Sequence, residues 1–530
     1  MNELQSNLFL EKARLKAFAI GFLFLLAYWA FGYDGITFSD DVYYLLAGKK
    51  FWAGEMVVND YHFSSRWGAY VPAGLIGFLF GFDAHIISLI SLISYVLTLF
   101  LVLKILPKSV PPWILVLWFC TQVYFLHFLS KVYPDSLLVL FVCLVPVAAS
   151  YRNAKPVFSG FMLALALFLG FLTKETSVLL APFPLLLFVF DLKKESLSQA
   201  FYLSIFVTGI VLLSVYLGYF WVKFDDPFHR ISSINAGHYI SEFTYADKSC
   251  WSMLKRLTIL PIITFVERSY WAWIVFAIPG IALGLKTKRS PQFEFSLAFL
   301  CLLVGFWLMS STLEFYNPIY LNPRHLIILI PILAMLIALG WKEWLSDGKW
   351  RFRIMGLLTM GTVIGIVQTD WKMAGFQLAL VVAVFVYRTK FQSIVFAGIL
   401  AAPALMAIPY QQNLKQYNFM IETLSKEVQS SGNQSFLVTN DFLEFSDQVL
   451  FPDDEISQEK LNGLECLSRW NEPKTDTVRL VLYSYYRHAY PQEQEEIDRV
   501  LLKLQKLGYT LQQEESDGVI WKGIYVEELK

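Results

Sequence analysis

Long apolar segments recur through the first four hundred residues of this chain and then stop. Of its 530 residues, 56% are hydrophobic and only 16% are charged, whereas soluble domains carry about 25% charged residues. Because a helix needs roughly 20 apolar residues to cross a bilayer, the sequence predicts a polytopic α-helical membrane protein with about thirteen transmembrane helices. The predicted spans lie near residues 16–33, 84–105, 111–130, 135–150, 157–173, 176–191, 200–221, 268–285, 293–311, 324–341, 353–369, 373–388 and 392–409.

Basic residues mark one side of the predicted membrane. Lys and Arg concentrate in cytoplasmic loops, and with the N-terminus inside, every predicted inner connection is basic. These connections carry Lys12, Arg14 and Lys16; Lys104 and Lys108; Arg152 and Lys155; Lys193 and Lys194; Lys286, Lys288 and Arg289; Lys342, Lys349, Arg351 and Arg353; and Arg388 and Lys390. We therefore expect a cytoplasmic N-terminus. Compact loops and the lack of a eukaryotic targeting signal favour the bacterial inner membrane.

Two enlarged loops and the tail then lie outside the cytoplasm. The loops span 34–83 and 222–267, and the composition turns polar at residue 410. We expect a transmembrane domain over 1–409 and a small extracytoplasmic α/β domain over 410–530, because about 100 residues can build a core of their own.

Apolar patterning predicts several elements in this tail. Residues 435–439 and 478–483 read as buried strands, and 491–507 has helical periodicity. Residues 519–526 read as one or two closing strands.

Two adjacent carboxylates, Asp40 and Asp41, follow the first predicted span on the outer side. An acid at a membrane boundary is costly and often functional. Capping of a following helix explains Asp40 better than Asp41. Two close carboxylates raise the pKa of one of them, which suits a general base. We predict that at least one is catalytic, with Asp41 preferred, and that Tyr43 and Tyr44 pack beside a substrate or anchor the interface.

Other charged residues open or close predicted spans at the outer surface. Asp135 opens the fourth span, either as a helix cap or as a second site acid. Lys174 and Glu175 separate the fifth and sixth spans, as a solvated turn or as part of a buried site. Arg324 opens the tenth span and is followed by His325, which we predict to bind substrate together with Glu175. A guanidinium there suits bidentate phosphate binding, with snorkelling to lipid head groups as the alternative.

Cations and histidines also occur in the two enlarged loops. Arg66, near His62, would supply a second phosphate-binding cation, and His229, Arg230 and His238 follow the seventh span, where they could line an acceptor site. Zinc-ligand spacings, a P-loop and a dinucleotide fingerprint are missing from the sequence, so no metal site is predicted. A formal net charge of +0 gives no indication of nucleic-acid binding.

The order of these motifs resembles a known family. An external acid pair follows the first span, Pro134-Asp135 opens the fourth, Leu172-Thr173-Lys174-Glu175 ends the fifth, and Pro323-Arg324-His325 opens the tenth. Residues 1 to 410 thus look like the GT-C glycosyltransferases. The most similar branch holds the protein O-mannosyltransferases and the bacterial aminoarabinose transferases of lipid A (glycosyltransferase family 39).

The resemblance implies a GT-C fold and an inverting transfer of a sugar from a polyprenyl phosphate. The acceptor would be a lipid, a glycan or a protein on the non-cytoplasmic face. Asp41 or Asp40 would take the role of the catalytic acid residue, and Arg324 and Lys174 would hold the donor phosphate. No cofactor is implied, and a divalent metal stays open. The first external loop departs from the aminoarabinose branch, because Arg66-Trp67-Gly68 stands near where that branch has Lys-Pro-Pro.

Two other membrane functions compete with this interpretation. A flippase or transporter for a lipid-linked sugar predicts symmetry-related halves and interrupted helices near the bilayer midplane, and the sequence shows neither. A polysaccharide polymerase or ligase usually has its large external loop late among the spans, whereas here the loops come after the first and the seventh span.

Overall fold

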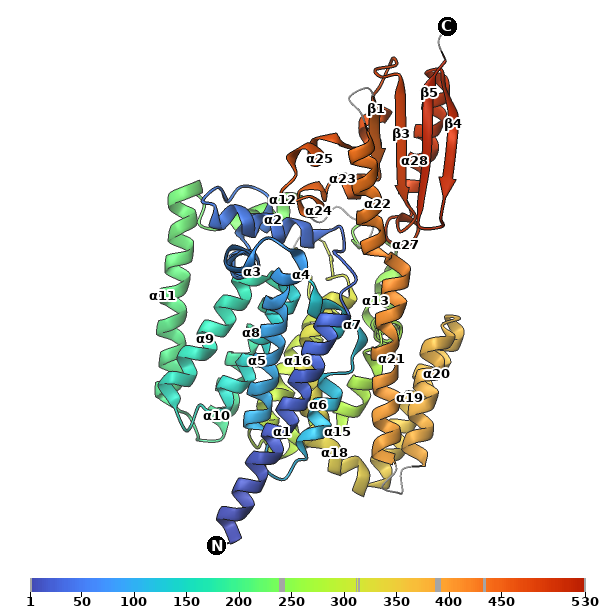
Figure 1. Cartoon of the computed structure of the whole chain (residues 1–530). Helices are drawn as coiled ribbons and strands as arrows, with labels where there is room; N and C mark the ends of the chain where they lie inside the picture. Colours follow the sequence, from blue (N-terminus) through green and yellow to red (C-terminus); the bar gives the residue numbers. More distant parts are fainter. Residues whose placement is uncertain are drawn as a thin grey trace. The chain divides into compact units, whose positions relative to one another are not determined.

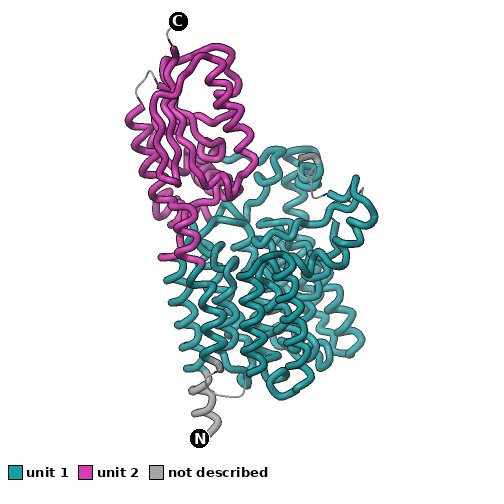
Figure 2. The backbone as a smooth tube through the Cα atoms, turned by 90° about the vertical axis from the view of Figure 1, so that its right-hand side faces the viewer, with its two compact units in different colours: residues 1–30, 55–72, 88–406 teal, residues 31–54, 73–87, 407–530 magenta. Residues whose placement is uncertain are grey.

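The computed structural model groups the chain into two compact units (Figure 2). It describes residues 2–237, 244–310, 312, 315–386, 392–431 and 435–528. Unit 1 contains residues 1–30, 55–72 and 88–406, and unit 2 contains residues 31–54, 73–87 and 407–530. Part of the first predicted external loop is therefore grouped with the C-terminal tail.

Helices build unit 1 (Figure 1). Its long helices are α1 (Asn2–Phe31), α5 (Leu89–Ile105), α8 (Pro134–Ser150), α9 (Pro156–Thr173), α10 (Pro182–Lys193), α11 (Gln199–Phe224), α15 (Trp271–Thr287), α16 (Gln292–Leu308), α18 (Ile330–Ser346), α19 (Gly348–Val367), α20 (Trp371–Phe385) and α21 (Gln392–Lys415). Shorter pieces include η1 (His62–Ser65), α3 (Trp67–Phe80), α6 (Pro112–Phe119), α7 (Val123–His127), η2 (Phe128–Ser130), η3 (Glu175–Leu180), α12 (His229–Gly237), α13 (Cys250–Thr258), α14 (Leu260–Glu267), α17 (Pro323–Leu326) and η4 (Ile327–Leu329). Of these helices, α3 continues into unit 2 from residue 73 and α21 from residue 407.

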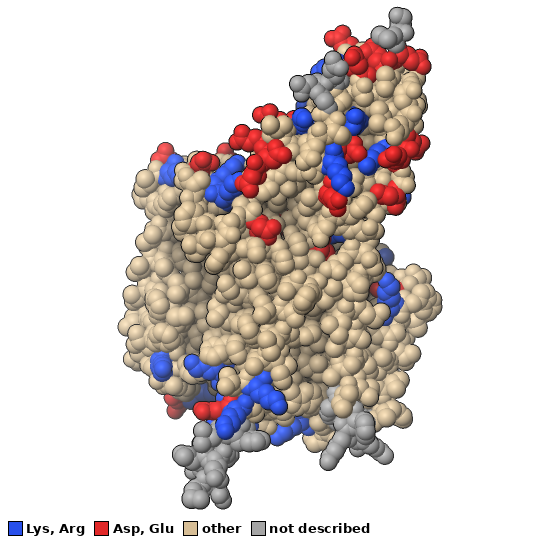
Figure 3. Space-filling view, viewed as in Figure 1, with Lys and Arg blue, Asp and Glu red and all other residues tan. Residues whose placement is uncertain are grey.

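The surface of these helices suits a lipid environment. On the face shown in Figure 3, a broad band of uncharged residues covers the helices of unit 1, and charged side chains gather at the ends of this band. The most apolar 18-residue window of α11 has a mean hydropathy of 2.2, yet only 11% of its residues are buried inside the protein. The protein is a multi-pass membrane protein.

The predicted number of spans is not confirmed. Among the described residues, eight helices are long and apolar enough to cross a membrane, or ten if two bent pairs are each one span. The predicted spans at 135–150, 293–311 and 373–388 correspond to α8, α16 and α20, which belong to a group of shorter apolar helices of 10–17 residues.

Two apolar segments are interrupted, contrary to the sequence-based expectation. The α6 helix meets the segment Val123–Ser130 at 70°, and α14 meets α15 at 112°. At the first bend, the side chain of Gln122 accepts a hydrogen bond from Phe125 N at 2.6 Å and so caps a new helix. At the second bend, the hydroxyl of Tyr270 donates to the carbonyl of Pro323 at 2.8 Å. This bond joins the second break to the start of α17.

A five-stranded sheet forms the C-terminal part of unit 2, with strand order β2-β1-β3-β5-β4. Its strands are β1 (Ser435–Thr439), β2 (Leu461–Gly463), β3 (Thr477–Tyr483), β4 (Tyr509–Ser516) and β5 (Ile520–Glu527). The pairs of β1 with β2 and β3 are parallel, and those of β5 with β3 and β4 are antiparallel. The predicted small α/β fold of the tail is present, with one closing strand where one or two were expected.

Helices complete unit 2. They are α2 (Asp40–Trp52), α4 (Ala84–Ile87), α22 (Tyr417–Ser430), α23 (Asp441–Glu444), α24 (Asp447–Leu450), α25 (Glu455–Lys460), α26 (Leu464–Ser468), α27 (Tyr486–Ala489) and α28 (Glu493–Lys506). The apolar face predicted for 491–507 is that of α28, where Ile497, Val500 and Leu504 are buried. All five cysteines are free, so Cys250 and Cys466 are not paired.

Candidate functional site

A buried ion pair joins Lys174 to Asp135 in unit 1. Pro134 occupies the first turn of α8 and places Asp135 directly behind it. The ammonium nitrogen of Lys174 lies 2.8 and 2.7 Å from the two carboxylate oxygens of Asp135, which is 0% exposed. Burial lowers the pKa of Lys174 to about 8; Asp135 opposes this shift, and the nearby Arg324 and Arg66 add to it.

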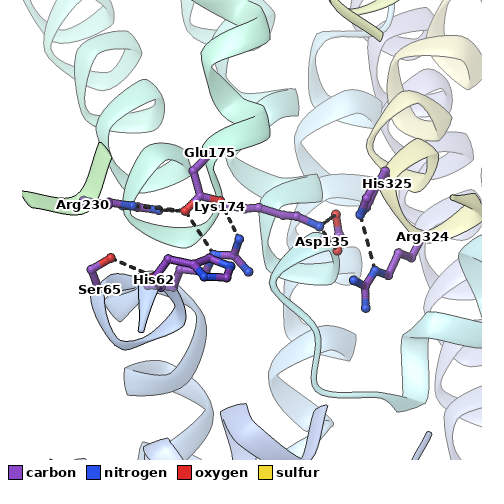
Figure 4. Close-up of polar contacts among 9 residues, drawn as sticks. His62, Ser65, Asp135, Lys174, Glu175, Arg230, Arg324 and His325 are labelled. Atoms are coloured by element: carbon purple, nitrogen blue, oxygen red, sulfur yellow. Dashed lines mark hydrogen bonds and ion pairs between the residues drawn. The ribbon is translucent and has the colours of Figure 1, made fainter. Parts of the chain in front are cut away.

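Two arginines hold the next residue, Glu175, at the start of η3 (Figure 4). Arg66 donates from Nε and Nη2 to the two carboxylate oxygens at 3.1 and 2.7 Å. Arg230, from α12, donates from Nε and Nη2 to Oε1 at 3.2 and 2.7 Å. The Lys-Glu pair is therefore part of a buried network, and the solvated-turn interpretation is wrong.

Close backbone packing brings Arg66 to this place. A Cβ atom on Gly68 would lie 2.3 Å from Oγ1 of Thr173 and 2.8 Å from its amide nitrogen. Only glycine permits this approach of the first external loop to the end of α9, one residue before Lys174.

Arg324 and His325 follow at the start of α17. The side chain of Asn322 accepts a hydrogen bond from Arg324 N at 3.1 Å and caps this turn. The Arg324 guanidinium lies over the ring of Tyr133 at 4.9 Å, and its Nε is 3.5 Å from Nε2 of His325. His325 Nδ1 lies 3.0 Å from the carbonyl oxygen of Tyr320.

These side chains form a row of charges, which Figure 4 shows from Arg230 to Arg324. The row contains four cations, namely Arg66, Lys174, Arg230 and Arg324, and two anions, namely Asp135 and Glu175. The net formal charge is therefore plus two. The Nη1 atom of Arg230 is buried and has no hydrogen-bond partner among the described residues. Such an arrangement is suited to an anion.

An apolar groove begins on the same short helix as Glu175. This cavity of about 540 Å³ lies between η3, α10 and α16. Its lining includes Val178, Leu179, Leu186, Leu297 and Val304.

The acid pair predicted in the first external loop lies in unit 2. Asp41 is 1% exposed. Its Oδ2 accepts from Thr37 N at 2.6 Å, and its Oδ1 accepts from Thr37 Oγ1 at 2.7 Å and from Ser39 N at 3.1 Å. Asp40 is half-buried in the first turn of α2. Asp41 thus bonds the loop before α2 rather than the helix amides, and a catalytic role for either acid stays a prediction.

The remaining predicted residues are distributed between both units. Tyr44 is buried, and its ring contacts that of Tyr43 at 5.7 Å. His62 is buried in η1, and His229 stacks on Phe224 at 3.7 Å. His238 lies outside the described residues.

Three residues of interest carry little sequence signal. The sequence suggests Arg230 only as part of an acceptor site, yet its guanidinium group forms an ion pair with Glu175. Asp34 and Lys415 form a buried ion pair at 3.2 Å in unit 2. The sequence offers one signal for Asp34, namely its position three residues beyond the end of α1. Within the described ranges, no group of three or more His, Cys, Asp or Glu side chains is placed to hold a metal ion.

Solved structures share this fold. The crystal structure of ArnT from Cupriavidus metallidurans bound to undecaprenyl phosphate is similar with a TM-score of 0.60 and 12% sequence identity, over 96% of this chain and 97% of that one. The apo structure of the same ArnT gives a TM-score of 0.55 at 11% identity, covering 99% and 98% of the two chains. The chain has the GT-C fold. No protein-family model and no curated protein sequence matches it.

Proposed function

We propose that this GT-C protein is an inverting glycosyltransferase that moves a sugar from a polyprenyl phosphate to an acceptor at the non-cytoplasmic face. The observation that carries this proposal is the row of charges with net charge plus two, next to an apolar groove on the same short helix. A polyprenyl phosphate has the same two parts, an anionic head and an apolar tail. The shared fold with an ArnT that binds undecaprenyl phosphate supports this assignment.

Arg66, Lys174 and Arg324 are the proposed ligands of the donor phosphate. Guanidinium groups bind phosphate in a bidentate manner, and an ammonium group adds a compact charge. The two anions orient the cations in advance: Glu175 holds Arg66, and Asp135 holds Lys174. Glu175 therefore acts at the donor site by orienting Arg66.

The groove is the proposed site of the first isoprene units of the donor. Its walls come from η3, α10 and α16 and carry mainly aliphatic side chains. Burial of each CH₂ group is worth about 0.8 kcal/mol, so a few isoprene units contribute substantially to affinity.

Asp41 is the proposed general base. It would take the proton of an acceptor hydroxyl as that oxygen attacks the anomeric carbon; the bond from this carbon to the phosphate oxygen breaks on the opposite face, which inverts the configuration. A carboxylate offers about four acceptor positions, and three hydrogen bonds occupy Asp41. One position is then left for the hydroxyl. Base catalysis contributes about 10²–10⁴ in rate.

Asp40 and Asp135 are the alternative bases. Asp135 is the weaker candidate, because both of its oxygens bond Lys174. Tyr43, Tyr44 and His325 are proposed to contact the sugar or the acceptor, which is a lipid, a glycan or a protein.

Transport of a lipid-linked sugar is less well supported. Its signature is an interrupted helix near the bilayer midplane. Of the two breaks, the one between α14 and α15 is joined to the start of α17, beside Arg324, by the hydrogen bond from Tyr270 to Pro323, and so adjoins the row of charges. The cytoplasmic N-terminus and a bacterial inner membrane remain our proposals for orientation and location.

Transfer of a radiolabelled hexose tests the proposed function. Purified protein in lipid nanodiscs receives a polyprenyl-phosphate hexose and a membrane extract as acceptor. Asp41→Asn should abolish transfer while donor binding is retained. Asp60→Asn is the matched control, because the Asp60 side chain is 96% exposed in the same predicted loop.

Each other outcome redirects the assignment. Transfer by Asp41→Asn at the wild-type rate moves the base to Asp40 or Asp135. A wild-type protein that binds no polyprenyl-phosphate sugar refutes this donor class.

A further inference from the structure

Side chains from the C-terminal region hold the loop that carries Asp41 by its backbone. The ammonium nitrogen of Lys415, at the end of α21, donates to the carbonyl of Ile36 at 2.9 Å. The hydroxyl of Tyr490, after α27, donates to the carbonyl of Phe38 at 2.7 Å and lies 3.2 Å from the carbonyl oxygen of Thr37, the more distant of its two acceptors. These donors follow their acceptors by 379 and 452 positions in the chain, and all four residues belong to unit 2.

The first of these peptide groups also bonds Asp41. Because a trans peptide group is planar, its oxygen and its N–H point in opposite directions. The peptide between Ile36 and Thr37 receives Lys415 at its oxygen. Its N–H, which belongs to Thr37, donates to Oδ2 of Asp41 at 2.6 Å. Lys415 and Asp41 thus bind the two sides of one peptide group.

The second peptide group repeats this arrangement. The peptide between Phe38 and Ser39 receives the Tyr490 hydroxyl at its oxygen. Its N–H, which belongs to Ser39, donates to Oδ1 of Asp41 at 3.1 Å. Hydrogen bonds in series polarise one another, so a donor at the oxygen strengthens the bond at the N–H.

The loop adopts a conformation that depends on these contacts. Gly35 has φ +90°, and a Cβ atom there would lie 2.2 Å from the ring of Tyr417. Phe38 has φ 57°, a region that non-glycine residues rarely occupy. Its buried ring packs against Phe442 at 5.2 Å and Tyr483 at 6.1 Å. Such strained backbone persists where the surroundings over-determine it.

A buried ion pair fixes Lys415 in turn. Its ammonium nitrogen lies 3.2 Å from Oδ2 of Asp34, and both side chains are 1% exposed. The hydroxyl of Tyr483 donates to the backbone carbonyl of Lys415. The ammonium group that bonds the Ile36 carbonyl is therefore held by its ion pair with Asp34, and the backbone of Lys415 is held by Tyr483.

We propose that Lys415 and Tyr490 are positioning residues for Asp41, through which the C-terminal α/β region takes part in catalysis. They act through two peptide groups to set the direction in which the Asp41 carboxylate faces its acceptor. This inference rests on the proposed role of Asp41 as the base.

The other titratable groups around Asp41 are four phenols, the ammonium group of Lys415, and the acids Asp34, Asp40 and Asp83. Tyr33, Tyr417, Tyr485 and Tyr490 interact with its charge, and burial raises the pKa of each. The Tyr490 hydroxyl is therefore a donor throughout the neutral range. Asp34 interacts with two of these tyrosines, Tyr33 and Tyr485, and its charge is paired with that of Lys415.

Tyr490→Phe in the full-length protein is the test, because it removes one hydroxyl and keeps the ring that stacks on Phe442. Tyr509→Phe is the matched control: its hydroxyl also donates to a backbone carbonyl of unit 2, that of Thr475, at 2.5 Å. We expect Tyr490→Phe to lower kcat about tenfold, part of the contribution of base catalysis, with the donor KM unchanged. The acid limb of its pH–rate profile should shift, which a merely structural role would not cause.

Hydrogen–deuterium exchange of the peptide covering residues 33–41 gives a readout that does not need activity. Loss of one hydrogen bond should speed exchange there about fivefold in Tyr490→Phe and leave it unchanged in Tyr509→Phe. Equal exchange and equal kcat in the two variants would overturn the inference. A wild-type protein that transfers no sugar would instead refute the proposed function. Hydrogen–deuterium exchange of residues 33–41 would still show whether Tyr490 holds the loop before Asp41.

Discussion

Replacing Lys174 by Met probes the buried ion pair and the donor site together. Asp135 is 0% exposed and Lys174 is 6% exposed, so water cannot compensate for a lost partner. Removing one member of a buried pair leaves an uncompensated charge and costs about 3–5 kcal/mol of folding free energy. Thermal unfolding of the purified protein in detergent measures this loss.

The double variant Lys174→Met/Asp135→Leu separates the energy of the pair from its function. Replacement of both members of a buried ion pair by apolar residues of similar volume is often close to neutral for stability, so most of the loss should be regained. Lys426→Met is the control, since its pair with Glu422 has side chains that are 70% and 66% exposed. Exposed pairs of this kind contribute little to stability, so Lys426→Met should leave the unfolding temperature almost unchanged.

The stable double variant then tests the role of Lys174 as a phosphate ligand. Loss of a hydrogen bond to a charged group costs about 1.5–3 kcal/mol, which weakens binding of undecaprenyl phosphate about ten- to a hundredfold. Binding measured by scintillation proximity should show this decrease. Wild-type affinity in the double variant would refute the donor role, and a double variant as unstable as Lys174→Met would refute the account of the pair.

Three further predictions use other features. Because the pKa of Lys174 is about 8, affinity for a polyprenyl-phosphate hexose, whose diester stays singly charged, should fall as the pH rises through 8; titration of binding between pH 6.5 and 9.5 measures this, and a flat profile would contradict it. Val304→Trp, at a 53% exposed position in the groove, should raise KM about tenfold for a C55 donor by excluding roughly two CH₂ groups. An unchanged KM in steady-state assays would contradict this assignment of the groove. Burial raises the pKa of Glu493 to about 7, against a hydrogen bond from Asn440 that opposes the shift. The folded state therefore holds this proton more tightly, and the stabilisation is present below pH 4.5 and lost as pH rises through 7; Glu493→Gln should remove this dependence of Tm on pH.

Local sequence signals predict the helices well because proline and apolar length act locally. Pro134, Pro156, Pro182 and Pro323 each occupy a first turn, where the missing N–H costs nothing. The α6–α7 break was missed because the apolar run continues across it. Its one local sign is the side chain of Gln122, which caps the new helix.

Pairing within the site is not a local property. Lys174 and Asp135 were both predicted as site residues, but their contact joins positions 39 apart, and each also had a bland local explanation. The tail showed α/β periodicity and no catalytic motif, because Lys415 and Tyr490 act on a loop more than 370 positions away. The periodicity of apolar residues indicates which face of a helix or strand is buried. It does not indicate which distant backbone groups the polar side chains of that element bond.

The charge balance of the row bears on how the proposed reaction is accelerated. Arg66, Lys174 and Arg230 are buried, and buried cations without counterions would be prohibitively costly. Glu175 and Asp135 offset half of the four positive charges of the row while fixing the geometry. A polyprenyl-phosphate sugar carries one negative charge, whereas the departing phosphate monoester carries about −1.5 to −2 at neutral pH. A net charge of plus two therefore complements the leaving group better than the donor. Interactions that strengthen as charge develops lower the barrier rather than merely binding the substrate. In the proposed reaction, the two anions thus bring the net charge of the row close to that of the departing phosphate.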